Sequence, residues 1–215
     1  MKKYELTEET LTVSEKTLYR IRAVRDFGFV KTGEFGGYIE KEENLSHFGN
    51  AWICGDAKVF GNARVSGNAW VYSNAEVSGN AKVCGNAWIC GNTKVSGNAR
   101  VSGNAWFSGN AKVSGNAWFS GNAKVSGNAW FSGNAEVFNT RHFFVQGPIG
   151  SRDGYVTFYR TKDDTVGVRC GCFSGSLQEF VNQVEETHGG SRYEKEYKLA
   201  AELAKVCIRL EGESR

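Results

Sequence analysis

Residues suited to holding an anion gather in the last third of the chain. Gly150, Ser151 and Arg152 form a turn at the entrance of an expected strand, and Ser174 and Ser176 bound a second Gly/Ser turn before an expected helix. The amide N–H groups of such turns, and of a helix N-terminus, favour negatively charged groups. The two segments together indicate a site for a phosphate or a nucleotide.

Arg169 accompanies these turns in an expected hairpin. Strand alternation places its side chain on the face opposite the apolar residues of the same strand. Gly171 lies two positions later, and its lack of a side chain lets a ligand approach the backbone. Thr157 and Tyr159, in the partner strand, are expected on the same face. The candidate ligand-binding residues are Gly150, Ser151, Arg152, Thr157, Tyr159, Arg169, Ser174 and Ser176. Ordinary hairpin and capping chemistry is the alternative, since no Walker or dinucleotide-binding motif is present.

Catalytic arrangements are missing from the same region. Residues 141–215 carry no Ser-His-Asp or paired-carboxylate pattern, and His142 and His188 are expected to be structural or solvent-exposed. Cys170 and Cys172 are spaced as C-x-C, which is not a zinc-binding spacing. The sequence therefore predicts no catalytic residue, no metal site and no cofactor, and the protein is expected not to be an enzyme.

Charge and cysteine content set the expected compartment. The net charge is +3, with its excess in residues 51–140, which is too small to indicate nucleic-acid binding. No signal peptide or transmembrane run is apparent, so the six cysteines are expected to be reduced thiols in the cytoplasm. If the chain is viral, that compartment is the host cytoplasm. No membrane partner is expected.

The element that must position the candidate site is a repeat covering residues 51–140. Its motif is Gly-Asn-Ala-x-Val-Ser, as in Gly61–Ser66. The repeat region holds fifteen such hexads in total, without insertion or deletion. The branched or aromatic residue and the Ala two positions before it share one face of an extended chain, and the residue between them points the other way. Gly and Asn tolerate left-handed backbone angles and mark a corner. Each hexad is predicted to be a short strand followed by a sharp turn.

Three six-residue sides close a triangular coil of 18 residues, so the repeat region predicts about five coils. An α-helix is excluded, because a period of six does not match 3.6 and nearly every hexad carries a Gly and an Asn. The fold class is mainly β: a single-stranded parallel β-helix with an N-terminal β cap and a small α+β C-terminal domain. Residues 1–50 are expected to hold the cap and first coil, 51–140 the β-helix, and 141–215 the C-terminal domain.

The repeat resembles the hexapeptide-repeat, left-handed parallel β-helix family, in which an aliphatic residue is followed four positions later by a small one. Val65 and Ala69 match this pattern, as do Val71 and Ala75. The left hand is implied by the resemblance. The family's acyltransferases use a histidine base and loops that interrupt the coil, whereas no His lies between His47 and His142 here. At most, a degenerate transferase is expected.

The outward positions of one predicted side form a tryptophan ladder. The four residues are Trp52, Trp70, Trp88 and Trp106. They are expected to form a subunit interface, with a trimer favoured by the resemblance, or to lie against one another as a surface ladder. A platform for sugars or bases is the alternative. The other two sides are mostly basic and are expected to be solvated.

The flanking segments are expected to close the ends of the coil, because an open end exposes strand edges and the apolar interior. Ile39 and Leu45 keep the six-residue step and are expected to begin the first coil. Residues 1–50 resemble the leader that precedes the coils in bacterial and phage hexapeptide-repeat proteins described as transferases. Residues 141–215 are predicted as β-β-β-α-α and resemble the tails of phage proteins, with Ser176 and Glu179 forming a capping box.

These observations predict a non-enzymatic, oligomeric binding protein, encoded by a phage. The β-helix is the scaffold, and the C-terminal domain sequesters an anionic small molecule such as a signalling nucleotide, which would serve immune evasion. Two alternatives stay open. The first is a purely structural spacer or polymer-forming β-helix, and the second is a degenerate hexapeptide acyltransferase.

Overall fold

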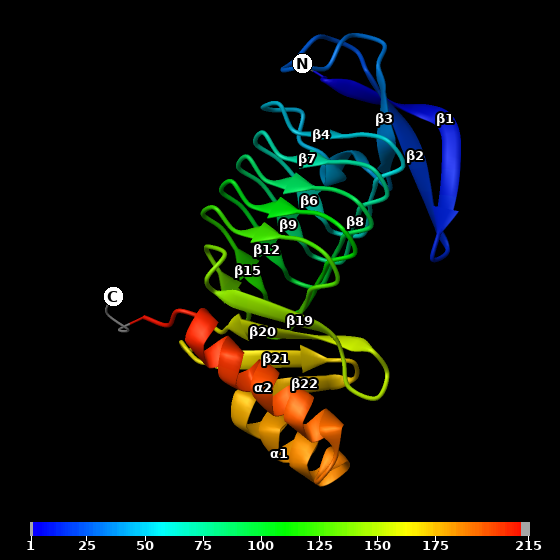
Figure 1. Ribbon diagram of the computed structural model, residues 1–215. Coiled ribbons are helices and arrows are strands. Elements are labelled where there is room, and N and C mark those ends of the chain that lie inside the picture. Colours follow the sequence, from blue (N-terminus) through cyan, green and yellow to red (C-terminus); the bar gives the residue numbers. More distant parts are fainter. Residues whose placement is uncertain (1, 212–215) are drawn as a thin grey trace.

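The computed structural model describes residues 2–211 and shows a mainly β protein in three parts (Figure 1). The N-terminal part holds β1 (Tyr4–Val13), β2 (Lys16–Ala23), β3 (Phe35–Ile39) and the short 3-10 helix η1 (Glu42–Asn44). A β-solenoid follows, and a four-stranded sheet with two helices completes the chain. This arrangement confirms the predicted fold class.

The solenoid consists of fifteen two-residue strands at a constant step of six residues. They are β4 (Trp52–Ile53), β5 (Lys58–Val59), β6 (Arg64–Val65), β7 (Trp70–Val71), β8 (Glu76–Val77), β9 (Lys82–Val83), β10 (Trp88–Ile89), β11 (Lys94–Val95), β12 (Arg100–Val101), β13 (Trp106–Phe107), β14 (Lys112–Val113), β15 (Trp118–Phe119), β16 (Lys124–Val125), β17 (Trp130–Phe131) and β18 (Glu136–Val137). The second residue of each strand is buried, together with the Ala or Thr93 two positions before it. No loop interrupts the walls, as the hexad pattern predicts.

Each strand pairs in parallel with the strand three places further along, which builds three sheets. Two of them are β4-β7-β10-β13-β16 and β6-β9-β12-β15-β18, and the third continues β5-β8-β11-β14-β17 into β3, β2 and β1. Ile39 pairs with Val59 and Leu45 with Val65, so both residues begin the first coil as expected. With this early coil the solenoid has about six turns rather than five.

The corner glycines are held in place by the next coil. Gly97 has φ of +67°, and a Cβ atom built there would lie 2.8 Å from the backbone nitrogen of Gly115. Gly127 has φ of +72°, but a Cβ atom there meets nothing within 4 Å, because no further coil follows. The two positions share the same backbone strain and differ in steric overlap.

This difference gives a matched pair of variants. Gly127→Ala is expected to cost about 1 kcal/mol of unfolding free energy, which is the price of a left-handed alanine. Gly97→Ala is expected to cost about 2 kcal/mol more, because the coils must also separate. Urea denaturation of both variants measures the difference. Equal losses would contradict the close stacking of the corners.

Asparagine side chains at the three corners form hydrogen-bonded ladders along the solenoid. In each ladder the Nδ2 atom donates to the Oδ1 atom of the Asn 18 residues later, at 3.0–3.2 Å. The ladders are Asn62–Asn80–Asn98–Asn116, Asn68–Asn86–Asn104–Asn122 and Asn74–Asn92–Asn110–Asn128. All of them run in one direction, so each ends with an amide donor at the C-terminal end.

The N-terminal part covers one end of the solenoid and buries a residue expected on the surface. Trp52 has no exposed surface, because Tyr4 and Phe27 pack against its ring with centroids 6.4 and 5.3 Å away. The prediction that Trp52 is part of an exposed ladder was therefore wrong. Hexad spacing places Trp52 on the outward side correctly, but it does not reveal that the cap folds over that side.

The C-terminal domain covers the other end (Figure 1). Its strands are β19 (Phe143–Ile149), β20 (Gly154–Arg160), β21 (Val166–Cys170) and β22 (Phe173–Ser176), followed by α1 (Leu177–His188) and α2 (Arg192–Cys207). The predicted three strands are thus four. Ser174–Ser176 is not a turn but lies in β22, where Ser174 pairs with Arg169. The turn falls earlier, at Gly171, which has φ of +54°.

Backbone donors of the last coil are satisfied by this domain. Inter-coil bonds run from an N–H group of one coil to a carbonyl of the next, so the final coil has N–H groups without a following coil. Trp130 N–H donates to the Thr157 hydroxyl at 2.9 Å, and Phe138 N–H donates to His142 Nδ1 at 3.3 Å. Unpaired buried donors are costly, so the domain serves as the cap that the sequence predicts.

Candidate functional site

A pocket of about 560 Å³ lies where the C-terminal domain meets the last coil. Its walls are mainly apolar and aromatic, and they come from the solenoid, the sheet and both helices. The residues most relevant to binding are Asn128, Trp130, Arg152, Tyr155, His188 and Tyr197. We call this the junction pocket. Its volume falls within the range of about 300–1,000 Å³ that small-molecule sites occupy.

Only two of the eight predicted ligand-binding residues line the junction pocket. Ser151 and Arg152 do so, both exposed in the turn between β19 and β20. Arg152 is the only Arg or Lys in the lining, and no Asp or Glu lines it. The pocket therefore combines an apolar interior with one cationic group at the surface.

The amide donors expected at the two Gly/Ser segments are already occupied. Gly150 N–H donates to Glu196 Oε2 at 2.7 Å, and the Gly150 backbone packs against the Tyr197 hydroxyl. Ser176 N–H donates to Glu179 Oε2 at 2.7 Å within the predicted capping box. The expectation that these amides are free for an anion was wrong, because carboxylates of α1 and α2 reach them first.

The predicted shared face of the sheet exists, but the solenoid covers it. Thr157 bonds to the Trp130 amide, and Tyr159 packs against Phe131 with ring centroids 5.7 Å apart. The Arg169 guanidinium lies 3.9 Å from the centroid of Trp130. Ser174 contacts Ser132 through their hydroxyl oxygens at 3.1 Å. These four residues join the domain to the last coil, and Arg169 acts on the pocket only through Trp130.

Several lining residues were missed by sequence reasoning. Tyr155, His188 and Tyr197 are brought together by the packing of α1 and α2 on the sheet, which no local pattern specifies. Trp130 did carry a signal. It replaces a charged residue in the outward column Lys58, Glu76, Lys94 and Lys112, at the coil that contacts the domain.

Burial favours the neutral forms of two groups in the pocket, the Cys170 thiol and the Tyr197 hydroxyl. Burial raises the pKa of the Cys170 thiol, although its hydrogen bond with Tyr197 opposes the shift. Burial and the neighbouring Cys170 raise the pKa of Tyr197 to about 12. At pH 7 the thiol is therefore protonated and poorly nucleophilic. Asn128, the donor end of one ladder, adds an uncharged hydrogen-bond donor to the lining.

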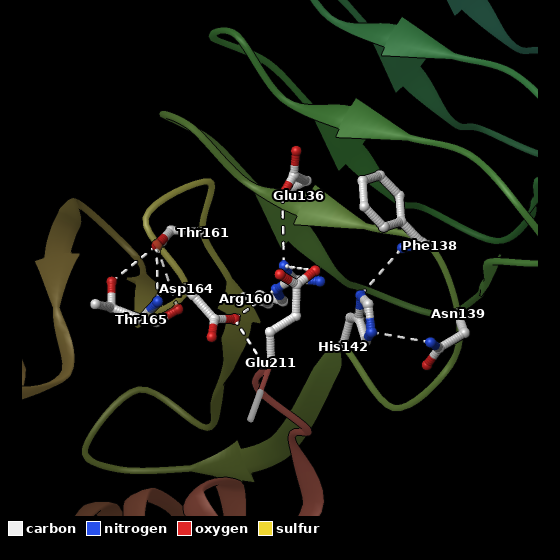
Figure 2. A network of polar contacts seen from close by, with 9 residues as sticks. All are labelled: Glu136, Phe138, Asn139, His142, Arg160, Thr161, Asp164, Thr165 and Glu211. Carbon is white, nitrogen blue, oxygen red and sulfur yellow. Dashed lines mark hydrogen bonds and ion pairs between the residues drawn. The ribbon is translucent and has the colours of Figure 1, made fainter. Parts of the chain in front are cut away.

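A second polar cluster centres on Arg160, whose side chain is 5% exposed (Figure 2). Its Nε donates to Asp164 Oδ1 at 2.8 Å, and its guanidinium reaches Glu211 at 2.7 Å and Glu136 at 3.8 Å. These carboxylates come from the β20–β21 turn, from the segment after α2 and from β18. The cluster ties three separate parts of the chain together and has the geometry of a structural clamp.

His142 belongs to the same joint and is structural. Its Nδ1 accepts the Phe138 amide, and its Nε2 lies 2.9 Å from Asn139 Nδ2 (Figure 2). Burial, with the adjacent positive charge of Arg160, lowers the pKa of His142. The imidazole is therefore neutral at pH 7, as an acceptor of the Phe138 N–H must be.

Three general properties apply to residues 2–211. None of the helices described is long and apolar enough to cross a bilayer. Among these residues, no three His, Cys, Asp or Glu side chains gather in a way that would hold a metal ion. The six cysteines are free thiols.

Comparison with known proteins bears on the repeat. The family model described as the YdcK beta-solenoid repeat matches residues 57–73 and 94–109. No curated protein matches the chain. Both matched segments lie within β5–β13, where the three parallel sheets stack. The match and the sheet topology together identify the chain as a β-solenoid repeat protein.

Proposed function

We propose that the protein is a non-enzymatic binding protein whose solenoid holds a ligand site at its C-terminal end. The ligand is a small molecule with an aromatic ring and an anionic group, and a nucleotide has both. The observation that carries this proposal is the junction pocket, where aromatic walls surround the space and Arg152 is the only charged residue in the lining.

The lining matches the two halves of such a ligand. The Arg169 guanidinium and the Lys112 ammonium lie 3.9 and 5.0 Å from the centroid of the Trp130 ring, so the indole is a fixed aromatic wall that a ligand ring can contact. Arg152 offers a guanidinium that can bind a phosphate or carboxylate with two hydrogen bonds. Asn128 and His188 supply further polar contacts at the edge of the pocket.

Chemistry in the pocket is disfavoured by the state of its groups. Catalysis by a thiol needs a lowered pKa, whereas the pKa of Cys170 is raised. Acyl transfer of the hexapeptide type would need a histidine in the coils, and residues 48–141 contain none. A degenerate acyltransferase is therefore the weaker alternative.

The rest of the proposal concerns assembly and biological use. Trp88 and Trp106 are 45% and 46% exposed, and their ring centroids lie 6.3 Å apart on one flat side of the solenoid. An apolar strip of this kind suits packing against further copies of the chain, with a trimer as the favoured assembly. A phage protein of the hexapeptide-repeat type that sequesters a host signalling nucleotide would use such an assembly to present several pockets.

The purely structural alternative has less support. A polymer-forming solenoid would need open ends, but the N-terminal part covers one end and the C-terminal sheet covers the other (Figure 1). A simple spacer has no need of an aromatic pocket.

Thermal denaturation with a panel of linear and cyclic nucleotides tests the proposal. Ligand at one hundred times its Kd is expected to stabilise the native protein by about 2.7 kcal/mol and to raise the melting temperature accordingly. Arg152→Ala should abolish most of the shift. Gly154→Phe should also abolish it, because Gly154 lines the pocket and a Cβ atom there meets nothing within 4 Å.

Two further variants serve as controls. Arg192→Ala removes an exposed positive charge of α2 that does not line the pocket and should leave the shift unchanged. Trp88→Ala should change the oligomer mass and keep the shift. If no nucleotide shifts the wild-type protein, or if Arg192→Ala acts like Arg152→Ala, the junction pocket is not the proposed site.

A further inference from the structure

A second groove lies on another side of the solenoid and shares no residue with the junction pocket. Its volume is about 480 Å³, and it lies over the sheet of β6, β9, β12, β15 and β18, beside the loop between β20 and β21. We call it the lateral groove. Its lining includes Asn98, Arg100, Asn116, Trp118, Glu136 and Lys162.

The cations of the lateral groove have no carboxylate partners. Among residues 2–211, neither Arg100 nor Lys162 makes an ion pair or a side-chain hydrogen bond. Arg100 continues an outward column that begins with Arg64 and Lys82, which are paired in register at the strand spacing of roughly 4.8 Å. Stacked like charges repel each other, so this column favours a bound anion.

The neighbouring side of the solenoid shows what a compensated column looks like. There Glu76 lies between two lysines in register, and Lys94 forms an ion pair with it at 3.0 Å. In the lateral groove the only carboxylate is Glu136, which is 15% exposed and already faces Arg160 at 3.8 Å. The positive charge of Arg100 and Lys162 is therefore available to a ligand.

Trp118 provides an aromatic surface next to these cations. It is 44% exposed, and its ring meets the ring of Phe138 edge-on, with centroids 5.5 Å apart at 79°. This contact fixes the indole against the solenoid while much of the ring stays open to the groove. A fixed and accessible indole is a stacking partner for a planar ring.

The asparagine ladder that runs from Asn62 to Asn116 ends in the lateral groove, where the side-chain amide of Asn116 is its last hydrogen-bond donor. The Lys41 ammonium, which can only donate, bonds to Asn62 Oδ1 at 3.3 Å and thereby sets the direction of the ladder. The amides then donate in sequence until Asn116, whose Nδ2 donates to no other described residue. Aligned hydrogen bonds polarise one another, so this terminal N–H group is a strengthened donor for an anion.

We propose that the lateral groove binds a nucleoside polyphosphate. The base stacks on Trp118, and the phosphate chain lies against Arg100, Lys162 and the terminal amide of Asn116. Lys82 and Arg64 extend the positive column for the outer phosphates. The two sites differ in their linings. The lateral groove is more polar and has two cations for a phosphate chain, whereas the junction pocket is mainly aromatic and has one cation, Arg152, for a single anionic group.

Isothermal titration calorimetry with adenosine triphosphate, without added divalent cations, tests this proposal. Arg100→Ala and Lys162→Ala are each expected to weaken binding about tenfold, the loss of one charge-assisted contact. Trp118→Ala should also weaken it about tenfold by removing the stacking partner. Inorganic triphosphate should bind more weakly and be insensitive to Trp118→Ala.

Matched control variants distinguish binding at the lateral groove from nonspecific attraction of the anion to the positively charged solenoid. Lys94→Ala removes the same charge from the neighbouring column and should change the Kd less than twofold. Arg152→Ala should remove binding at the junction pocket and leave the Kd of the lateral groove unchanged, so the two sites can fail independently. A wild-type protein that binds no adenosine triphosphate, or an equal effect of Lys94→Ala and Arg100→Ala, would overturn the proposal.

Discussion

Arg160→Met is expected to lower the free energy of unfolding by about 3 kcal/mol. The guanidinium of Arg160 is almost fully buried and contacts Asp164, Glu211 and Glu136, which belong to three separate parts of the chain (Figure 2). Removing one partner of a buried ionic cluster costs about 3–5 kcal/mol, because the other charges stay desolvated. We expect the lower end of this range for Arg160→Met, because the Glu211 side chain is 77% exposed and water can solvate its carboxylate after the arginine is removed.

Urea denaturation followed by circular dichroism measures this loss. Glu211→Gln is the control, because an exposed member of the cluster is expected to contribute less than about 1 kcal/mol. Arg160→Met should also speed hydrogen exchange at the Phe138 and Arg160 amides, which lie in the same joint. A loss below about 1 kcal/mol for Arg160→Met would show that the clamp does not hold the domain to the solenoid.

Phe131→Ala is expected to cost about 3–5 kcal/mol, the range for large aromatic truncations in a core. Phe131 is fully buried and connects the interior of the solenoid to the C-terminal domain. Its ring centroid lies 4.9 Å from that of Phe119, 5.4 Å from Phe143 and 5.7 Å from Tyr159. The cavity left by alanine would open between the two parts.

Two comparisons give this prediction a control. Phe107→Ala removes an equally buried ring that contacts Phe119 within the solenoid, so it should cost stability without loosening the domain. Phe131→Val should cost less, about 1–2 kcal/mol, because valine fills the same position one coil earlier at Val113. Limited proteolysis should cut between solenoid and domain faster in Phe131→Ala than in Phe107→Ala. Identical proteolysis would mean that Phe131 does not join them.

The solenoid was predictable because its physics is local. A six-residue step fixes which residue points inward, and Gly at nearly every corner fixes the bend, with Ser73 as the exception at φ of +61°, so each hexad carries the information for its own structure. The same reasoning placed Ile39 and Leu45 in the first coil. It does not extend to Trp52, because burial of an outward residue depends on a cap that folds back from elsewhere in the sequence.

The candidate site was predictable only in part, for a related reason. Strand alternation placed Thr157, Tyr159 and Arg169 on one face correctly. It contained no information about what covers that face, which is the last coil. The junction pocket arises from the docking of a sheet and two helices on Trp130, and docking is a tertiary property. Arg152 was found because an exposed arginine in a turn keeps its chemistry wherever the turn lies.

Native mass spectrometry tests the central claim, binding at the junction pocket, most directly. After incubation with nucleotides that carry a single phosphate, and so lack the phosphate chain that the lateral groove binds, the wild-type protein is expected to carry one small-molecule adduct per chain. The adduct should disappear in Arg152→Ala and in Gly154→Phe, and it should persist in Arg100→Ala. An adduct that survives both junction variants, or a wild-type protein that carries none, would contradict binding at this pocket.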